Sequence, residues 1–271
     1  MKQCLIYLTH RWSFFISDHF KKIYNELSNV GVDVFIFYDS ILENNIEFKK
    51  TIQYNKYMFN HNKIHINLLI GKDKYRKLID PYHVIKEIML ENKDVFSQYK
   101  YTYFYEYDVY FDGDLGEYIK TLNNYDDDLI ASYITDDLTK LNRWIHYGQW
   151  LTACSILNYK NDIIDNLKYI RSCISFFRIN TEMLYRTFDK KYEFFTDNSL
   201  YELHIPTLIN YFGGTIKSIG PDESNKYYIG FTSVKNKSYS ATVFFYSIKY
   251  ALQVKLQNNW PDKLFYTRIK H

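Results

Sequence analysis

Apolar positions along the chain fall into short continuous runs separated by stretches with helical spacing. Residues 3–8 form such a run, and apolar residues recur at helical spacing between residues 20 and 30. We expect Ser17 or Asp18 to cap this helix and Gly31 to end it. A second apolar run follows directly and predicts a buried strand, so that the first forty residues form a β-α-β unit.

The rest of the chain continues the alternation of strands and helices. The pattern predicts strands at residues 64–70, 101–111, 129–134, 151–158 and 215–219, and helices at residues 82–92, 162–177 and 200–212. Strands that alternate with helices indicate an α/β fold with a mostly parallel sheet flanked by helices. Beyond residue 230 the pattern weakens, so we expect one domain with a C-terminal extension.

Composition is that of a globular protein. Of 271 residues, 46% are hydrophobic and 24% charged, which excludes disorder, collagen and coiled coil. Glycine occurs only nine times, and the sequence contains neither a P-loop nor a GxGxxG motif. A glycine-rich phosphate-binding loop is therefore not expected.

The charge balance argues against a nucleic-acid partner. The 34 basic and 31 acidic residues give a net charge of +3, too little for a generally basic surface. The tail from residue 234 onward holds seven basic residues and one acid, and this tail could contact an anionic membrane. Three cysteines without metal spacing and no apolar run long enough to span a membrane favour a cytoplasmic protein.

The most informative segment is acidic and lies within the strand predicted at residues 101–111. Glu106 and Asp108 are two positions apart, so in a strand they project to one side while Tyr105 and Tyr107 face the other. Two adjacent carboxylates raise each other's pKa, and a divalent cation such as Mg²⁺ or Mn²⁺ would remove that penalty. The alternative is a solvated face of an edge strand.

This E-x-D strand end, following a β-α-β unit, resembles the GT-A-type glycosyltransferases, in which a DxD-like motif holds a divalent metal on a nucleotide-sugar diphosphate. Residues 128–132 resemble the next strand of that fold, and residues 199–206 with Gly213 and Gly214 resemble its late helix and turn. The resemblance implies a Rossmann-like, GT-A-like domain over residues 1–220, with a nucleotide-sugar half at 1–112 and an acceptor half at 113–220. A basic, aromatic C-terminal extension covers 221–271.

The resemblance also implies roles for particular residues. Asp108 would be the main ligand of Mn²⁺ or Mg²⁺, and Glu106 would contact the metal or the ribose. Thr9, His10 and Asp39 would bind the nucleotide base and ribose at the first two strand ends. Each of these three could equally be an ordinary polar loop residue. Glu106 replaces the first Asp of a strict DxD, which leaves the metal dependence open.

Residues in the second half could serve the chemistry and the acceptor. Glu202 begins a late helix, where inverting members of the fold carry the base that deprotonates the acceptor; it could instead be an acid that favours the helix dipole. His204 could complete the metal site, although a lone histidine is often structural. An aromatic loop could bind acceptor hydroxyls or form a packed cluster; it carries Trp144, His146 and Trp150. The acidic turn of Asp136 and Asp137 could likewise bind sugar hydroxyls or simply be solvated.

The resemblance implies a hexosyltransferase that uses a nucleotide diphosphate sugar; the sequence does not identify the sugar or the nucleotide, and we take a UDP-sugar with galactose as a starting assumption. The acceptor would be a glycan or lipid-linked glycan in surface polysaccharide or lipopolysaccharide synthesis, at the inner face of the membrane. Two alternatives remain: a sugar nucleotidyltransferase, which usually carries a glycine-rich loop near its N-terminus, and a non-catalytic carbohydrate-binding module.

Overall fold

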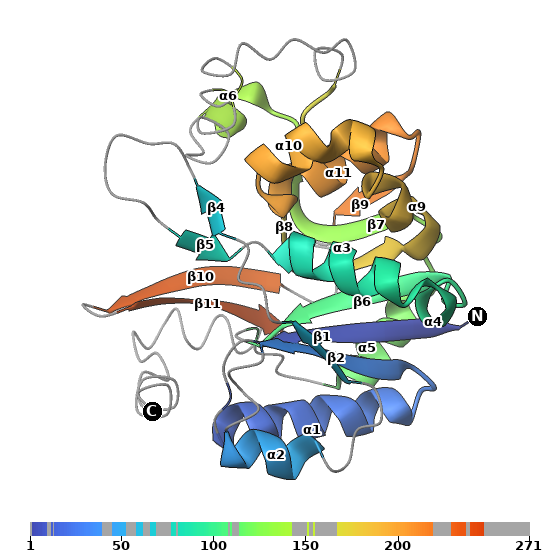
Figure 1. Cartoon of the computed structure of the whole chain (residues 1–271), viewed down its shortest axis with the longest axis vertical. Helices are drawn as coiled ribbons and strands as arrows, with labels where there is room; N and C mark the ends of the chain where they lie inside the picture. Colours follow the sequence, from blue (N-terminus) through green and yellow to red (C-terminus); the bar gives the residue numbers. More distant parts are fainter. Residues whose placement is uncertain are drawn as a thin grey trace. The chain divides into compact units, whose positions relative to one another are not determined.

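The computed structural model describes most of the chain (Figure 1). The described residues are 2–9, 12, 14–39, 45–52, 58–61, 66–68, 77–79, 81–107, 109, 114–142, 151, 154, 167–218, 229–236 and 239–246. The chain divides into two compact units that interleave along the sequence. Unit 1 takes residues 62–102 and 127–218, and unit 2 takes residues 2–61, 103–126 and 219–271. Unit 2 resumes at residue 219, close to residue 221, where we expected the C-terminal extension to start. The boundary that we expected between the two halves, at residue 112, falls inside unit 2.

Unit 2 is built on parallel strands. In order, these are β3 (Met58–His61), β2 (Asp33–Asp39), β1 (Gln3–Thr9) and β6 (Tyr101–Glu106). β2 pairs in parallel with both β1 and β3. Every residue of β1 is buried, as expected for a strand covered on both faces, and this explains its continuous apolar run.

In the described part of unit 2 the helices are α1 (Phe14–Ser28), α2 (Ile46–Ile52) and α5 (Leu115–Leu122). α1 packs on β2 and contacts the other two helices, and Figure 1 shows α1 and α2 along one side of β1 and β2. The predicted end of α1 is confirmed, because Gly31 adopts a φ of 73° and the amide of Val32 donates to the carbonyl of Leu27 at 3.0 Å. The predicted cap is wrong, since α1 already begins at Phe14 and Ser17 and Asp18 lie inside it.

Unit 1 carries the rest of the sheet. β6 begins in this unit, and the strand order continues through β8 (Arg171–Asn180), β7 (Leu129–Thr135) and β9 (Ile216–Ser218). β7 pairs in parallel with β9 and antiparallel with β8. β4 (Ile66–Leu68) and β5 (Lys77–Ile79) form a separate antiparallel pair.

Unit 1 contains a hydrophobic core cluster of Leu141, Leu167, Tyr192, Phe195, Leu203 and Leu208, together with the remaining described helices. They are α3 (Pro81–Glu91), α4 (Lys93–Phe96), α6 (Leu138–Asn142), α9 (Thr181–Thr187), the 3-10 helix Lys190–Tyr192, α10 (Glu193–Asn198) and α11 (Tyr201–Tyr211). α3, α11 and β9 match predicted elements. The predicted α/β class, a mostly parallel sheet flanked by helices, is confirmed.

Two predictions for the region between residues 151 and 177 are wrong. The C-terminal part of the helix predicted at residues 162–177 is strand β8. Short apolar runs carry no period that separates a strand buried on both faces from a buried helix, and Phe176, Phe177 and Arg178 are all buried. In the strand predicted at residues 151–158, the described residues Leu151 and Cys154 are helical.

The extension at residues 221–271 contains a hairpin that the sequence did not predict. β10 (Ile229–Asn236) and β11 (Tyr239–Tyr246) pair antiparallel from Ile229 opposite Tyr246 to Asn236 opposite Tyr239. The basic residues beyond position 246 lie outside the described residues. Of the helices that the structure describes, none is long and apolar enough to cross a membrane.

Candidate functional site

The carboxyl ends of three strands of unit 2 come together at one edge of the sheet. The backbone amide of Tyr107, directly after β6, donates to the carbonyl of Leu8 in β1 at 3.0 Å. On the other side of β1, Thr9 lies opposite Tyr38 of β2, the residue before Asp39. Thr9, Asp39 and Glu106 therefore end neighbouring strands, and in open α/β sheets ligands bind outside such ends.

The described side chains at this edge are only partly open to solvent. Thr9 is buried, and Glu106 is half-buried. For Asp39 the structure describes the backbone, where it lies opposite His61 at the end of β3. His10 and Asp108, both predicted to belong to this site, lie outside the described residues. The edge thus presents one described, half-buried carboxylate, that of Glu106, beside three strand ends.

The chain leaves the strand direction directly after Glu106. β6 ends at this residue rather than at the predicted residue 111, and the amide of Val109 donates to the carbonyl of Glu106 at 3.0 Å, which closes a turn. The alternation of faces in a strand therefore cannot be extended from Glu106 to Asp108. The prediction that Glu106 and Asp108 share a face assumed that the strand continues to residue 111, and this assumption is wrong.

A buried tyrosine lies beneath this turn. The hydroxyl of Tyr105 donates to the carbonyl of Val109 at 3.0 Å, and Nε2 of His19 in α1 lies 3.4 Å from the same hydroxyl. Burial, together with the positive charge of Lys22, lowers the pKa of His19 to about 4. The imidazole is therefore neutral at neutral pH. Sequence reasoning missed both residues, because nothing in their spacing reveals a contact between α1 and a turn some ninety residues later.

The donor set suits a metal that arrives with a diphosphate. Among the residues that the structure describes, no three His, Cys, Asp or Glu side chains form a group that could hold a metal ion. Mg²⁺ and Mn²⁺ in nucleotide sites usually take one or two protein carboxylates, and phosphate oxygens and water supply the other ligands. Glu106 fits that requirement, with Asp108 as the predicted second carboxylate.

Glu202 and His204 lie in α11 of unit 1. Glu202 is half-buried in the first turn of this helix, as predicted. His204 is fully buried, with Nδ1 within 3.2 Å of both the hydroxyl and the carbonyl of Ser199 and its ring packed edge-on against Tyr82. Burial lowers the pKa of His204 well below its usual value. These contacts account for the histidine as a core residue, and its role as a metal ligand stays a prediction.

Of the predicted acceptor residues, the structure describes Asp136 and Asp137. Asp136 is exposed and forms an ion pair of 2.5 Å with Lys168, whose hydrogen bond lowers the pKa of the Asp136 carboxyl. Asp137 accepts a hydrogen bond from the amide of Thr139 at the start of α6. The aromatic loop lies outside the described residues; it carries Trp144, His146 and Trp150.

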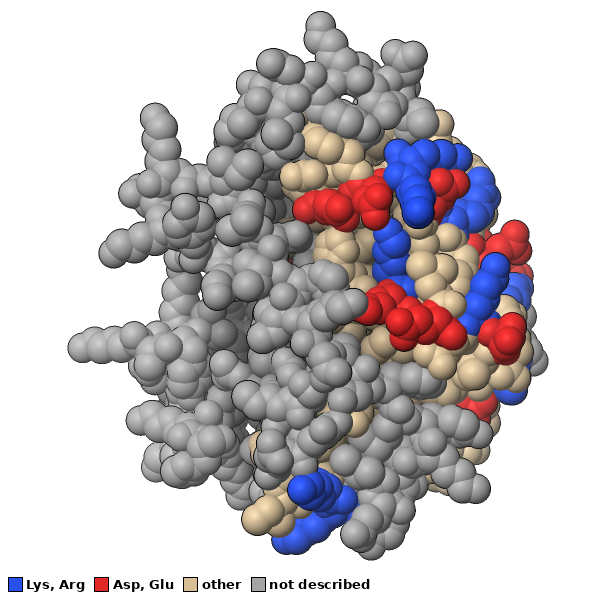
Figure 2. Space-filling model, viewed as in Figure 1, with Lys and Arg blue, Asp and Glu red and all other residues tan. Residues whose placement is uncertain are grey.

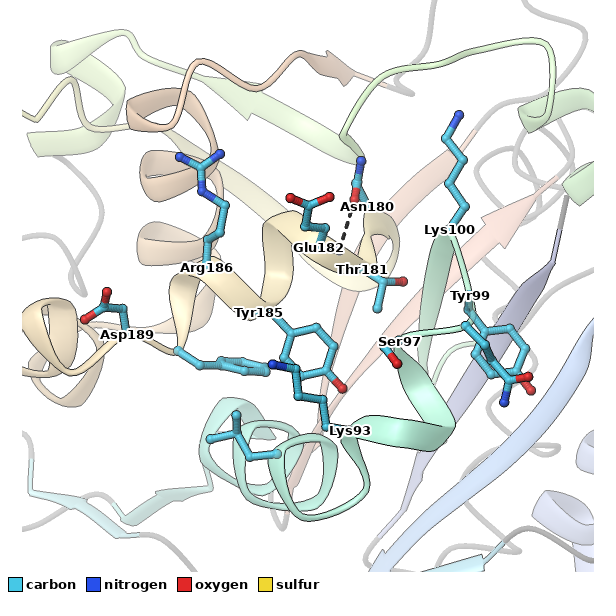
Figure 3. A pocket seen from close by; sticks show the side chains of 13 residues that line it. Lys93, Ser97, Tyr99, Lys100, Asn180, Thr181, Glu182, Tyr185, Arg186 and Asp189 are labelled. Carbon is cyan, nitrogen blue, oxygen red and sulfur yellow. Dashed lines mark hydrogen bonds between the residues drawn. The ribbon is translucent and has the colours of Figure 1, made fainter.

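A cavity of about 880 Å³ opens in unit 1 (Figure 3). It is lined by residues around the end of α4, by α9 and by Lys100, which directly precedes β6. None of the residues predicted for the nucleotide site lines this cavity. On the face shown in Figure 2, acidic and basic side chains of the described residues are intermixed, without a continuous basic surface.

Comparisons with known proteins give only remote similarities. No protein family model matches the sequence, and no curated protein matches it. Among solved structures, the galactosyltransferase LgtC in complex with donor and acceptor sugar analogs is 10% identical, with a TM-score of 0.44 over 80% of this chain and 73% of that one. The 4-diphosphocytidyl-2C-methyl-D-erythritol synthase from Anaerococcus prevotii is 11% identical, with a TM-score of 0.40 over 83% and 90%.

A third similarity is to a protein from Desulfovibrio desulfuricans assigned as a nucleotide-diphospho-sugar transferase. It is 14% identical with a TM-score of 0.32, and the match covers 49% of this chain and 58% of the other, so the chain spans little more than half of that protein. Function must therefore be argued from the residues of the chain itself.

Proposed function

We propose that the chain is a glycosyltransferase that transfers a hexose from a nucleotide diphosphate sugar to a glycan acceptor. The observation that carries the proposal is that three strands end at one edge. The bond from Tyr107 to Leu8 joins the ends of β6 and β1, and the pairing of β1 with β2 adds the third. Thr9, Asp39 and Glu106 are the last residues of these strands. Such an edge accepts nucleotides in open α/β sheets. A carboxylate beside it suits the metal that accompanies a diphosphate.

Each predicted site residue has a proposed task. Thr9, His10 and Asp39 bind the nucleoside, with Asp39 accepting hydrogen bonds from ribose hydroxyls. Glu106 and Asp108 hold Mn²⁺ or Mg²⁺, and the ion, when bound, neutralises the charge that develops on the leaving diphosphate. Glu202 removes the proton of the acceptor hydroxyl in an inverting transfer. Asp136, Asp137, Trp144, His146 and Trp150 bind the acceptor sugar.

A sugar nucleotidyltransferase is the second candidate, because such enzymes also use an α/β sheet and metal-bound carboxylates. They usually follow the first strand with a glycine-rich loop around the triphosphate. Here β1 ends at Thr9 and α1 begins at Phe14, and the sequence between them contains no glycine. This short, glycine-free connection favours the glycosyltransferase.

The acceptor that we propose is a glycan of surface polysaccharide or lipopolysaccharide, at the inner face of a membrane, with UDP-galactose as donor. The test is a screen of the full chain with UDP-galactose, UDP-glucose and other nucleotide sugars, with Mn²⁺ and without acceptor, in which slow hydrolysis releases the nucleoside diphosphate. Release of a diphosphate from one donor supports the transferase. Release of pyrophosphate from a nucleoside triphosphate and a sugar phosphate would support the nucleotidyltransferase instead.

A further inference from the structure

The side chain of Tyr105 lies on the opposite face of β6 from Glu106, since neighbouring residues of a strand alternate. It is fully buried, yet its hydroxyl reaches past the end of the strand and donates to the carbonyl of Val109 at 3.0 Å. Tyr105 therefore contacts the turn that follows Glu106 from the face of β6 opposite to the Glu106 side chain.

The backbone of this turn is held at several points. The amide of Tyr107 donates to the carbonyl of Leu8, and the amide of Val109 donates to the carbonyl of Glu106, both at 3.0 Å. With the bond from Tyr105, both backbone groups of Val109 are paired, and Val109 is 3% exposed. Loss of the tyrosine hydroxyl would leave a buried carbonyl without this partner, which is more costly than the loss of an exposed hydrogen bond.

Tyr105 is itself fixed by its neighbours. Its ring stacks on Tyr7 with centroids 5.8 Å apart and an interplanar angle of 15°. Nε2 of His19 lies 3.4 Å from its hydroxyl. Because this imidazole is neutral and the hydroxyl proton is used toward Val109, we assign the imidazole proton to Nε2, which then donates to the hydroxyl oxygen. The chain of hydrogen bonds runs from α1 through Tyr105 to the turn.

We propose that Tyr105 is a positioning residue that fixes the backbone of the turn between Glu106 and Val109, and thereby orients Glu106 toward a metal-bound nucleoside diphosphate. The second half of this inference rests on the proposed function; the first half concerns the free protein alone. Because the side chain of Tyr105 faces away from that of Glu106 and bonds to the carbonyl of Val109, its proposed effect passes through the turn.

The chain offers a matched control for Tyr105→Phe. Tyr103 lies two residues earlier on the same face of β6, is also fully buried, and Tyr103→Phe removes the same single oxygen atom. Tyr103→Phe therefore reports the effect of removing a buried hydroxyl from the same face of β6 at a position that does not contact Val109. A positioning role predicts an effect at the turn for Tyr105→Phe alone.

The first measurement is hydrogen exchange of the free full-length protein, read in peptides that cover the amides of Tyr107 and Val109. We expect exchange about tenfold faster in Tyr105→Phe and within about twofold of wild type in Tyr103→Phe, since a tenfold change corresponds to about 1.4 kcal/mol, close to the contribution of one hydrogen bond. Unchanged exchange in Tyr105→Phe, or equal acceleration in both variants, would overturn the positioning role.

The second measurement is UDP affinity by calorimetry, with Mn²⁺ and with EDTA. Tyr105→Phe should weaken Mn²⁺-dependent binding about tenfold and leave metal-free binding within about twofold, while Tyr103→Phe changes neither. An unchanged Mn²⁺-dependent affinity in Tyr105→Phe would reject the orientation of Glu106. If the wild type binds no UDP, the proposed function fails, and hydrogen exchange still decides whether Tyr105 fixes the turn.

Discussion

Gly116 of α5 lies directly against the backbone of Glu26 in α1: a β-carbon at position 116 would come within 2.5 Å of the Glu26 carbonyl oxygen. The carboxylate of the same glutamate accepts a hydrogen bond of 2.9 Å from the amide of Leu115. One residue of α1 thus contacts the start of α5 through both its backbone and its side chain. The close approach explains why glycine occupies this position inside a helix, where it is otherwise unfavourable.

Gly116→Ala should therefore destabilise the protein despite the better helix propensity of alanine. The added methyl group meets backbone rather than a flexible side chain, so α5 must move, and overpacking of this kind costs about 1–3 kcal/mol. Urea unfolding measures the loss. Asn25→Ala, an exposed change on α1, serves as control and should stay within about 0.5 kcal/mol of wild type. A Gly116→Ala protein as stable as wild type would disprove the close packing of α1 and α5.

Stability should fall as the pH is lowered from about 6.5 toward 4. Burial lowers the pKa of His19 from 6.5 to about 4, so between these values the unfolded chain binds a proton that the folded chain does not. The stabilisation is complete above pH 6.5 and is lost toward pH 4, with a total of roughly 3 kcal/mol at 1.36 kcal/mol per unit. Burial lowers the pKa of His204 as well, and its effect has the same sign.

Urea unfolding at pH 7 and pH 5 tests this linkage. For His19 alone we expect a difference of about 2 kcal/mol between the two pH values. His19→Gln, which cannot titrate, should lose this part of the difference. The same pH dependence in wild type and His19→Gln would contradict the assignment.

The first part of the fold could be predicted because its signals are local. The strand, helix and strand from residue 3 to residue 39 follow from an apolar run, a helical period and Gly31. The segment at residues 171–180 misled the prediction because its environment is made by elements elsewhere in the sequence, including β7 and α11, which its own pattern does not contain. Secondary structure was least predictable where tertiary contacts decide it.

Part of the candidate site could be predicted because the positions of strand ends are also a local signal. Strand ends mark Thr9, Asp39 and Glu106 because parallel strands end at a common edge. The turn after Glu106 could not be foreseen, since it depends on the amide of Val109 and on Tyr105 beneath it. The alternation of residues in a strand predicts which face a side chain occupies only within the strand, and β6 ends at Glu106.

Glu202→Gln should lower turnover by about 10²–10⁴-fold and leave nucleotide affinity almost unchanged, because glutamine keeps the size and hydrogen bonding of the side chain but not its basicity. Steady-state kinetics with the active donor and acceptor measure both quantities. The anomeric configuration of the product, determined by NMR, should be opposite to that of the donor. Retention of configuration, or near-normal turnover in the variant, would return Glu202 to a role at the start of α11.

The basic tail should bind anionic vesicles in a salt-dependent manner. Lys249, Lys255, Lys263, Arg268 and Lys270 can each add about 1 kcal/mol near an anionic surface. Co-sedimentation with vesicles that contain phosphatidylserine should weaken as salt is raised. Equal binding to neutral and anionic vesicles would argue against membrane contact through the tail.

The central claim is that the edge formed by Thr9, Asp39 and Glu106 binds a metal-bound nucleoside diphosphate. Calorimetric titration of UDP, with Mn²⁺ and with excess EDTA, tests it in wild type, Glu106→Gln and Asp108→Asn. Glu117→Gln is the control, because Glu117 is exposed and pairs with Lys120. The account predicts that Mn²⁺ strengthens UDP binding in wild type and control, and that both site variants lose at least about tenfold in that affinity while circular dichroism shows an intact fold. UDP affinity that is the same in EDTA, or unchanged in both site variants, would contradict it.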